Sequence, residues 1–139
     1  THKWSEFVFI DGVLEALKKL SDLDKNLIIV TNQSGIARGY YTEQDYLQLE
    51  KMMLNTMKNF GIKILDVYHC PHHVDGSIAS LSIACSFRKP SPGMILSAIK
   101  EHDLDASRSC SFIAERIIPG EGFLNEHAIL REAIEPSTW

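Results

Sequence analysis

Apolar positions early in the chain change from a helical spacing to a short continuous run. Over 12–22 the apolar residues fall on one helical face, and Asp11 precedes them as a candidate N-cap. The β-branched run at 27–30 is typical of a strand buried on both faces, and it is followed by Thr31 and Asn32. The pattern therefore predicts a helix and then a strand with polar residues at its carboxyl end.

A second helix and a second strand follow. Thr42 stands before an acidic first turn, one apolar face continues over 43–60, and Gly61 follows. The apolar positions of 62–68 predict a strand that runs into a loop rich in His and Cys, beginning at His69. A strand, a helix and a strand in this order indicate a parallel crossover.

The remaining elements complete an α/β pattern. Ser91 is a candidate N-cap with Pro92 at the first helical position, and an apolar helical face follows. The run 110–113 is a candidate third strand. The alternation predicts a Rossmann-like open parallel sheet with helices on both faces, which binds ligands outside the carboxyl ends of its strands.

Composition narrows the class of protein. A chain of 139 residues, with 45% hydrophobic and 23% charged residues, suits one globular domain. The net charge of −4 and the scattered basic residues argue against nucleic acid as a partner. No apolar stretch reaches the length of a membrane span and no signal-peptide pattern opens the chain, so we expect a cytoplasmic protein.

The segment 30–39, V-T-N-Q-S-G-I-A-R-G, combines small polar groups with a cation at the end of the predicted strand. Thr31 and Asn32 lie where such a sheet binds its ligand, and Arg38 adds a positive charge. An ordinary strand-to-helix turn is the alternative, with about even odds. The backbone N–H groups that would form an anion nest belong to Gln33, Ser34 and Gly35.

A second candidate anion site is the segment R-K-P-S-P-G, where Arg88 and Lys89 stand before a helix N-terminus. Both side chains suit phosphate oxygens, as does the positive end of the helix dipole. A solvated charge pair is the alternative, and taken alone it is favoured by roughly two to one.

Cysteine and histidine residues form a candidate zinc site. Residues 71–84 separate Cys70 from Cys85, and His72 lies in this loop. Phe87 occupies the position where a fourth ligand would add a Cys-x-Cys pair to the Cys-x-His pair. A buried free cysteine beside surface histidines is the alternative. Residues that could complete the shell are His69, His73 and Cys110.

With these motifs in order, the chain resembles the haloacid dehalogenase superfamily of phosphohydrolases, and more closely its heptose bisphosphate phosphatase family. The resemblance runs from about Trp4 to Ile113 and rests on F-I-D-G-V, V-T-N-Q-S-G-I-A-R-G, C-P-H-H and R-K-P-S-P-G-M. The long gap between Cys70 and Cys85 resembles the zinc loop of the heptose enzymes, whereas histidinol-phosphate phosphatases have a shorter one.

The resemblance implies hydrolysis of the 7-phosphate of D-glycero-D-manno-heptose 1,7-bisphosphate, a lipopolysaccharide precursor, through an aspartyl-phosphate with Mg²⁺. It implies that Thr31 and Asn32 bind the phosphoryl oxygens and that Lys89 balances charge. Arg38 and Arg88 are then candidate substrate contacts. The implied structural zinc ligands are Cys70, His72 and Cys85, and the zinc site is incomplete because of Phe87.

The chain also departs from the family. The nucleophile motif D-x-D-G-T, at the end of the family's central first strand, is not in this sequence, and Asp11 belongs to a later segment. We therefore expect a partial phosphatase domain over 1–113, a destabilised sheet unless 7–10 or another chain fills the gap, and a divergent tail over 114–139. In that tail Glu115 is the candidate for the Mg²⁺ ligand.

Three functions remain open at this stage. The first is a heptose bisphosphate phosphatase, with this chain as an incomplete part that would be inactive alone. The second is a catalytically inactive remnant or phosphate-binding module. The third is a phosphatase for histidinol phosphate or another sugar phosphate.

Overall fold

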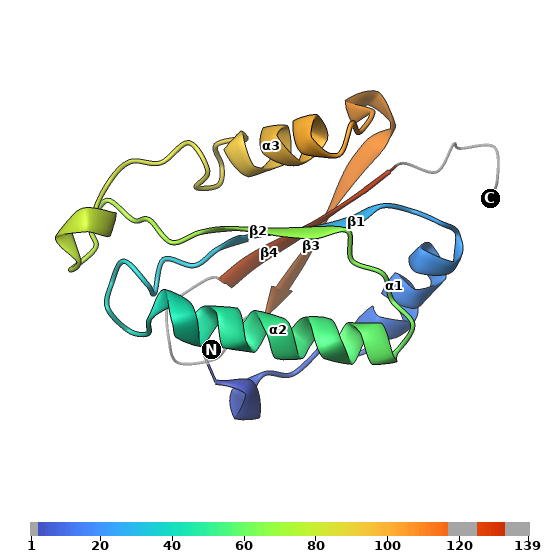
Figure 1. Ribbon diagram of the computed structural model, residues 1–139, viewed down its shortest axis with the longest axis horizontal. Helices are drawn as coiled ribbons and strands as arrows, with labels where there is room; N and C mark the ends of the chain where they lie inside the picture. Colours follow the sequence, from blue (N-terminus) through green and yellow to red (C-terminus); the bar gives the residue numbers. More distant parts are fainter. Residues whose placement is uncertain (1–2, 117–124, 133–139) are drawn as a thin grey trace.

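The computed structural model describes residues 3–116 and 125–132, and from residue 110 onward it describes the backbone alone. Three helices and four strands form the body of the fold, with three short 3₁₀ turns between them (Figure 1). In chain order the main elements are α1 (Val13–Asp22), β1 (Leu27–Asn32), α2 (Glu43–Asn59), β2 (Asp66–Cys70), α3 (Gly93–Glu101), β3 (Ser109–Arg116) and β4 (Asn125–Glu132).

The four strands form one sheet in the order β2-β1-β4-β3. β1 and β2 are parallel, whereas β4 runs antiparallel to both β1 and β3. In the register of the parallel pair, Asn32 faces Cys70 and Ile28 faces Asp66. The polar end of β1 and the Cys/His loop after β2 therefore lie at the same edge of the sheet, as the sequence predicts.

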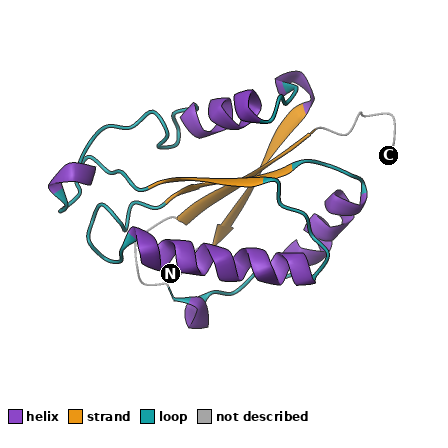
Figure 2. Cartoon of the chain, in the orientation of Figure 1, coloured by secondary structure: helices purple, strands orange, loops and turns teal. Residues whose placement is uncertain are grey.

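The helices cover both faces of the sheet (Figure 2). One apolar cluster joins β1 to α3 through Ile28, Val30 and Met94. The other joins the opposite face of β1 to α1 and α2 through Ile29, Leu17 and others. All four apolar residues of β1 are buried, which explains why its sequence is continuously apolar.

Two of the predicted helix starts need correction. α2 begins as predicted, with Thr42 and Asp45 forming a reciprocal capping box. In α1 the N-cap is Gly12, in a left-handed conformation, so Asp11 does not cap the helix. In α3 the N-cap is Pro92 without a side-chain hydrogen bond, so Ser91 is not the capping residue.

The second strand begins later than predicted. β2 starts at Asp66, and residues 62–65 lead into it with Ile62 buried beneath α2. The strand then continues through His69 to Cys70, where the sequence suggested a loop. Ile62 and Ile64 pack in the cluster of α1, α2 and β1, and periodicity alone does not separate such packing from pairing in a strand.

The position between β1 and β3 is filled by β4, which comes from the tail of this chain. The gap that we expected, unless 7–10 or another chain filled it, is therefore closed by β4 of this chain. The predicted parallel pairing holds for β1 and β2, and β4 adds antiparallel pairs with β1 and β3. Residues 7–10 form no strand; Phe7 instead stacks on Trp4, and Phe9 meets both rings edge-on and packs against the α1 and α2 side of the core. Pairing on both sides satisfies the backbone groups of β1.

Among the described residues, no helix combines the length and apolar character needed to cross a bilayer.

Candidate functional site

The polar end of β1 is held rigidly at the edge of the sheet. Thr31 is only 1% exposed, and its hydroxyl lies 3.4 Å from Oε1 of Gln33, which is also buried. The Gln33 N–H donates to the Cys70 carbonyl at 2.8 Å, which ties the chain after β1 to the end of β2. Thr31 and Asn32 therefore have a fixed backbone, as binding groups require.

The turn that follows leaves two backbone donors available. The Ile36 N–H donates to the Gln33 carbonyl and the Arg38 N–H to the Ser34 carbonyl. The N–H groups of Ser34 and Gly35 make no hydrogen bond to another described residue. A Cβ atom on Gly35 would lie 2.2 Å from the Tyr41 ring, so glycine is required for the close packing of this turn. The arrangement is compatible with an anion nest.

Asn32 and Lys89 are joined by two hydrogen bonds. The Lys89 N–H donates to Asn32 Oδ1 at 3.0 Å, and Asn32 Nδ2 donates to the Lys89 carbonyl at 3.4 Å. The Lys89 ammonium also lies 3.4 Å from the Val30 carbonyl, beside the end of β1. The two predicted anion segments, far apart in the sequence, therefore meet at one place.

The turn before α3 is tightly packed. The Gly93 N–H donates to the Ser86 carbonyl at 3.0 Å, and the Ser91 N–H donates to the Arg88 carbonyl at 2.9 Å. A Cβ atom on Gly93 would come within 2.4 Å of the same Ser86 oxygen. This contact sets the path of the backbone that carries Arg88 and Lys89 toward β1.

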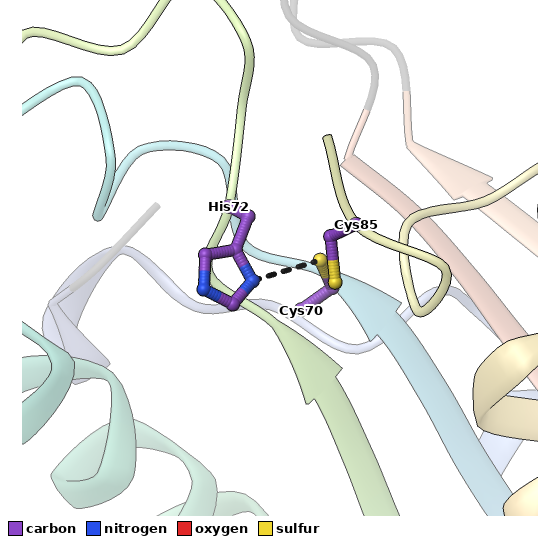
Figure 3. A group of neighbouring side chains, drawn as sticks. All are labelled: Cys70, His72 and Cys85. Atoms are coloured by element: carbon purple, nitrogen blue, oxygen red, sulfur yellow. Dashed lines mark hydrogen bonds between the residues drawn. The ribbon is translucent and has the colours of Figure 1, made fainter. Parts of the chain in front are cut away.

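Cys70, His72 and Cys85 come together beside the end of β2 (Figure 3). One ligand atom from each lies within 4.8 Å of the others. Cys70 is fully buried, whereas His72 and Cys85 are half-buried. Two sulfurs and an imidazole nitrogen are the donor set that zinc prefers, so these residues fit that metal.

Electrostatics at this cluster oppose ionisation while no metal is bound. Burial raises the pKa of the Cys70 thiol to about 11, and the neighbouring Cys85 adds to this effect. The Arg88 charge and a backbone hydrogen bond from His72 act in the opposite direction. At neutral pH a metal would therefore have to displace the thiol proton of Cys70 when it binds.

Two of the three residues suggested for the fourth ligand position, His69 and His73, make other contacts. His69 Nε2 lies 2.8 Å from the Glu43 carboxylate, and Arg38 donates to His73 Nε2 at 3.0 Å. Phe87 packs against the apolar cluster of β1 and α3. The side chain of Cys110 lies outside the described residues, as does that of Glu115 in β3.

The two arginines lie on the Cys/His side of the site. Arg38 is held by His73, and the charges of Arg38 and Arg88 add to burial in lowering the pKa of His73. Nη1 of Arg88 is buried without a hydrogen-bond partner among the described residues. The sequence suggested Arg38 and Arg88 as contacts for a ligand, but it did not predict that His73 would hold Arg38.

A second group of potential metal ligands, Asp66, Glu101 and His102, lies at the opposite end of β2. His102 Nε2 is 2.8 Å from the Asp66 carboxylate, and the Tyr68 hydroxyl donates to Glu101 at 2.7 Å. These contacts join the end of α3 to the start of β2, which explains the group without a metal. Sequence reasoning did not find it, because Asp66 lies far in the chain from the neighbouring Glu101 and His102.

Thr31, Asn32 and Lys89, the described side chains at the end of β1, supply no carboxylate for Mg²⁺. Mg²⁺ prefers carboxylate and water oxygens, whereas Thr31, Asn32 and Lys89 supply a hydroxyl, an amide and an ammonium group. Neither group of three potential ligands found among the described residues lies on these side chains. The role of Glu115 stays a prediction.

Comparison with known proteins gives a consistent result. The family described as polynucleotide kinase 3 phosphatase matches residues 1–115. The D-glycero-alpha-D-manno-heptose-1,7-bisphosphate 7-phosphatase of Photorhabdus laumondii is 46% identical over 108 residues, or 78% of this chain and 59% of the relative. The corresponding beta-anomer enzyme of Pasteurella multocida is 39% identical over 139 residues, or 99% of this chain and 75% of the relative.

A solved structure has the same fold. The D,D-heptose 1,7-bisphosphate phosphatase of B. bronchiseptica, crystallised with magnesium and phosphate, is 28% identical with a TM-score of 0.65. The match covers 75% of this chain and 54% of that one. The chain thus spans little more than half the length of several relatives that it matches.

Proposed function

Because the chain belongs to the polynucleotide kinase 3 phosphatase family of haloacid dehalogenase-like phosphatases, we propose that it forms the phosphoryl-binding part of a heptose 1,7-bisphosphate 7-phosphatase. The named relatives act on this sugar bisphosphate, and the family match covers residues 1–115. The same proposal places the protein in the cytoplasm, where a soluble sugar phosphate would be its partner.

The observation that carries the proposal is the pair of hydrogen bonds between Asn32 and Lys89. They hold the Lys89 backbone against the end of β1, where the Lys89 ammonium lies 3.4 Å from the Val30 carbonyl. A phosphate monoester carries about two negative charges at neutral pH and has three strong acceptor oxygens. Neutral donors and one ammonium group, fixed at the end of a buried strand, match that charge and shape.

Each group has a defined task in this proposal. The Thr31 hydroxyl, the Asn32 amide and the two backbone N–H groups donate to the phosphoryl oxygens. Lys89 offsets the charge that grows on the transferring group. The attacking carboxylate belongs to the D-x-D-G-T motif of the family, which the 139-residue sequence does not contain. Magnesium would supply further charge neutralisation when bound.

Zinc is the second part of the proposal. Cys70, His72 and Cys85 would hold the ion, which would fix the loop over 71–84 against the turn after β1. That contact already includes hydrogen bonds from the Ser77 and Ile78 N–H groups to the Ala37 carbonyl. A rigid loop at this position would form one wall of the substrate pocket without taking part in the chemistry.

The alternatives differ in what they bind and release. A phosphate-binding module would bind inorganic phosphate and heptose bisphosphate but release nothing. A histidinol-phosphate phosphatase would prefer the other substrate, and neither the names of the relatives nor the length of the Cys70–Cys85 loop favours it.

The test is a phosphate-release assay on heptose 1,7-bisphosphate with Mg²⁺, paired with calorimetric titration of the same ligand. Turnover that Lys89→Ala abolishes would support the phosphatase and exclude the binding module. If the chain binds heptose 1,7-bisphosphate without releasing phosphate, and Lys89→Ala weakens that binding, the site binds the phosphoryl group but does not catalyse its hydrolysis. If the chain neither binds the ligand nor releases phosphate from it, the proposal is refuted.

A further inference from the structure

The Cys70, His72 and Cys85 cluster supplies three ligand atoms, whereas zinc in structural sites has four protein ligands. Sites with three protein ligands keep one position for water or another exchangeable group. The question is therefore whether any described residue can close the fourth position.

The two nearby histidines do not supply the fourth ligand. His69 points to Glu43, with its Nε2 atom 2.8 Å from the carboxylate. Both ring nitrogens of His73 face donors, because Arg38 contacts Nε2 at 3.0 Å and the Asp75 N–H contacts Nδ1 at 3.0 Å. Either histidine would have to give up these contacts to reach the cluster.

Phe87 does not supply the fourth ligand either, because its side chain has no metal-binding atom and packs in the core. Its ring packs against the core cluster and lies 2.9 Å from the place where a Cβ atom on Gly93 would stand. Its backbone N–H donates to Cys85 Sγ at 3.4 Å. The position that would close the shell therefore carries an apolar ring directed into the core.

Two of the three ligand residues are partly exposed. Cys70 is fully buried, whereas His72 and Cys85 are half-buried. Arg88 lies near enough for its charge to act on both Cys70 and His73, and its buried Nη1 has no hydrogen-bond partner among the described residues. A divalent ion bound by two thiolates has no net charge. A further anion on the ion would give the complex one negative charge, which the positive Arg88 guanidinium can balance.

We infer that the Cys70, His72 and Cys85 site binds a divalent metal with three protein ligands and takes a small monodentate anion at its fourth position. This inference rests on the zinc part of the proposed function. It makes the site an exchangeable anion site beside the phosphoryl pocket, instead of a closed structural site.

Cobalt in place of zinc gives a direct readout, because its visible absorption reports its ligands. Azide is the probe, titrated into the cobalt-loaded full chain. We expect azide to shift the absorption and to saturate, with the shift lost in Phe87→Cys, which supplies the missing thiolate. Phe87→Ala is the matched control, since it removes the same ring without adding a ligand, and it should keep the azide response. Thermal unfolding of each variant shows whether it is folded.

Three results would overturn the inference. An insensitive wild-type spectrum that becomes sensitive to azide in Cys110→Ser would show that Cys110 closes the shell. A spectrum insensitive to azide in every variant would show a closed or inaccessible site. Failure of the wild type to bind cobalt or zinc, with metal binding in Phe87→Cys, would refute the zinc proposal itself. Phosphate binding at Lys89, measured separately, would be unaffected by any of these results.

Discussion

Asn32 and Lys89 hold each other through both the donor and the acceptor of the Asn32 amide, although they lie 57 residues apart in the sequence. The two contacts join the carboxyl end of β1 to the turn before α3. Because one amide serves both backbone groups of Lys89, a single residue controls where the lysine stands.

Replacing that amide should weaken both the fold and the site. Asn32→Ala leaves the Lys89 backbone groups without their partner, which should lower the free energy of unfolding by about 1–3 kcal/mol. Urea unfolding measures the loss, and phosphate titration should show weaker binding in the same variant. An unchanged unfolding midpoint would contradict the role given to these two hydrogen bonds.

The charge of Lys89 should matter more for binding than for stability. Lys89→Gln should weaken inorganic phosphate binding about ten- to a hundredfold, since a hydrogen bond to a charged group contributes roughly 1.5–3 kcal/mol. Lys100→Gln is the matched control, because Lys100 is an exposed lysine near the other end of α3. Equal effects from the two variants in calorimetry would mean that phosphate responds only to net charge.

Gly93 should not tolerate a methyl group. Gly93→Ala places its Cβ against the Ser86 carbonyl, which belongs to the backbone and cannot turn aside. We expect a loss of about 1–3 kcal/mol, as for other overpacked positions, together with weaker phosphate binding. Ser91→Ala is the control: its side chain does not cap α3, so its unfolding free energy should change little. A larger effect at Ser91 would contradict the observed helix start.

Zinc should stabilise the chain. A ligand that binds the folded state alone adds about 2.7 kcal/mol at a hundred times its dissociation constant, so zinc should raise the melting temperature in a concentration-dependent way. Chelation with EDTA should reverse the increase, and Cys85→Ser should abolish it. A melting temperature that does not depend on zinc would contradict zinc binding by the folded chain.

The place of β4 can be tested through its backbone. Ala128 pairs with Val30 on one side and Ile113 on the other. Ala128→Pro removes a backbone donor from an interior strand and should cost more than about 1 kcal/mol, the net value of one ladder hydrogen bond. Ala128→Val keeps the donor and serves as the control. If proline has no larger effect than valine in urea unfolding, β4 does not pair in the interior of the sheet.

Local signals explain which elements could be predicted. β1 begins with a continuous apolar run in which residues 28–30 are β-branched, and α2 has both a capping box and a glycine after its end, so each can be recognised within its own segment. The start of β2 could not be recognised, because Ile62 and Ile64 are apolar for packing against the helices and resemble the positions of a strand. The pairing of β4 depends on distant partners, and no local pattern specifies it.

The site divides in the same way. Residue types and spacing were enough to group Cys70, His72 and Cys85, and to mark Thr31 and Asn32 at a strand end. The contact between Asn32 and Lys89 could not be predicted, because it depends on how the turn before α3 packs. The pairing of Arg38 with His73 could not be predicted either, because it depends on how two loops pack against each other.

In our proposal the end of β1, the turn after it and Lys89 form one phosphoryl site. Amide chemical shifts of the ¹⁵N-labelled chain during titration with inorganic phosphate test whether these segments bind phosphate together. We expect the Ser34, Gly35 and Lys89 signals to move together and to saturate with one dissociation constant, and Lys89→Gln to reduce all these shifts. Shifts that appear elsewhere in the chain, or that do not saturate, would contradict it.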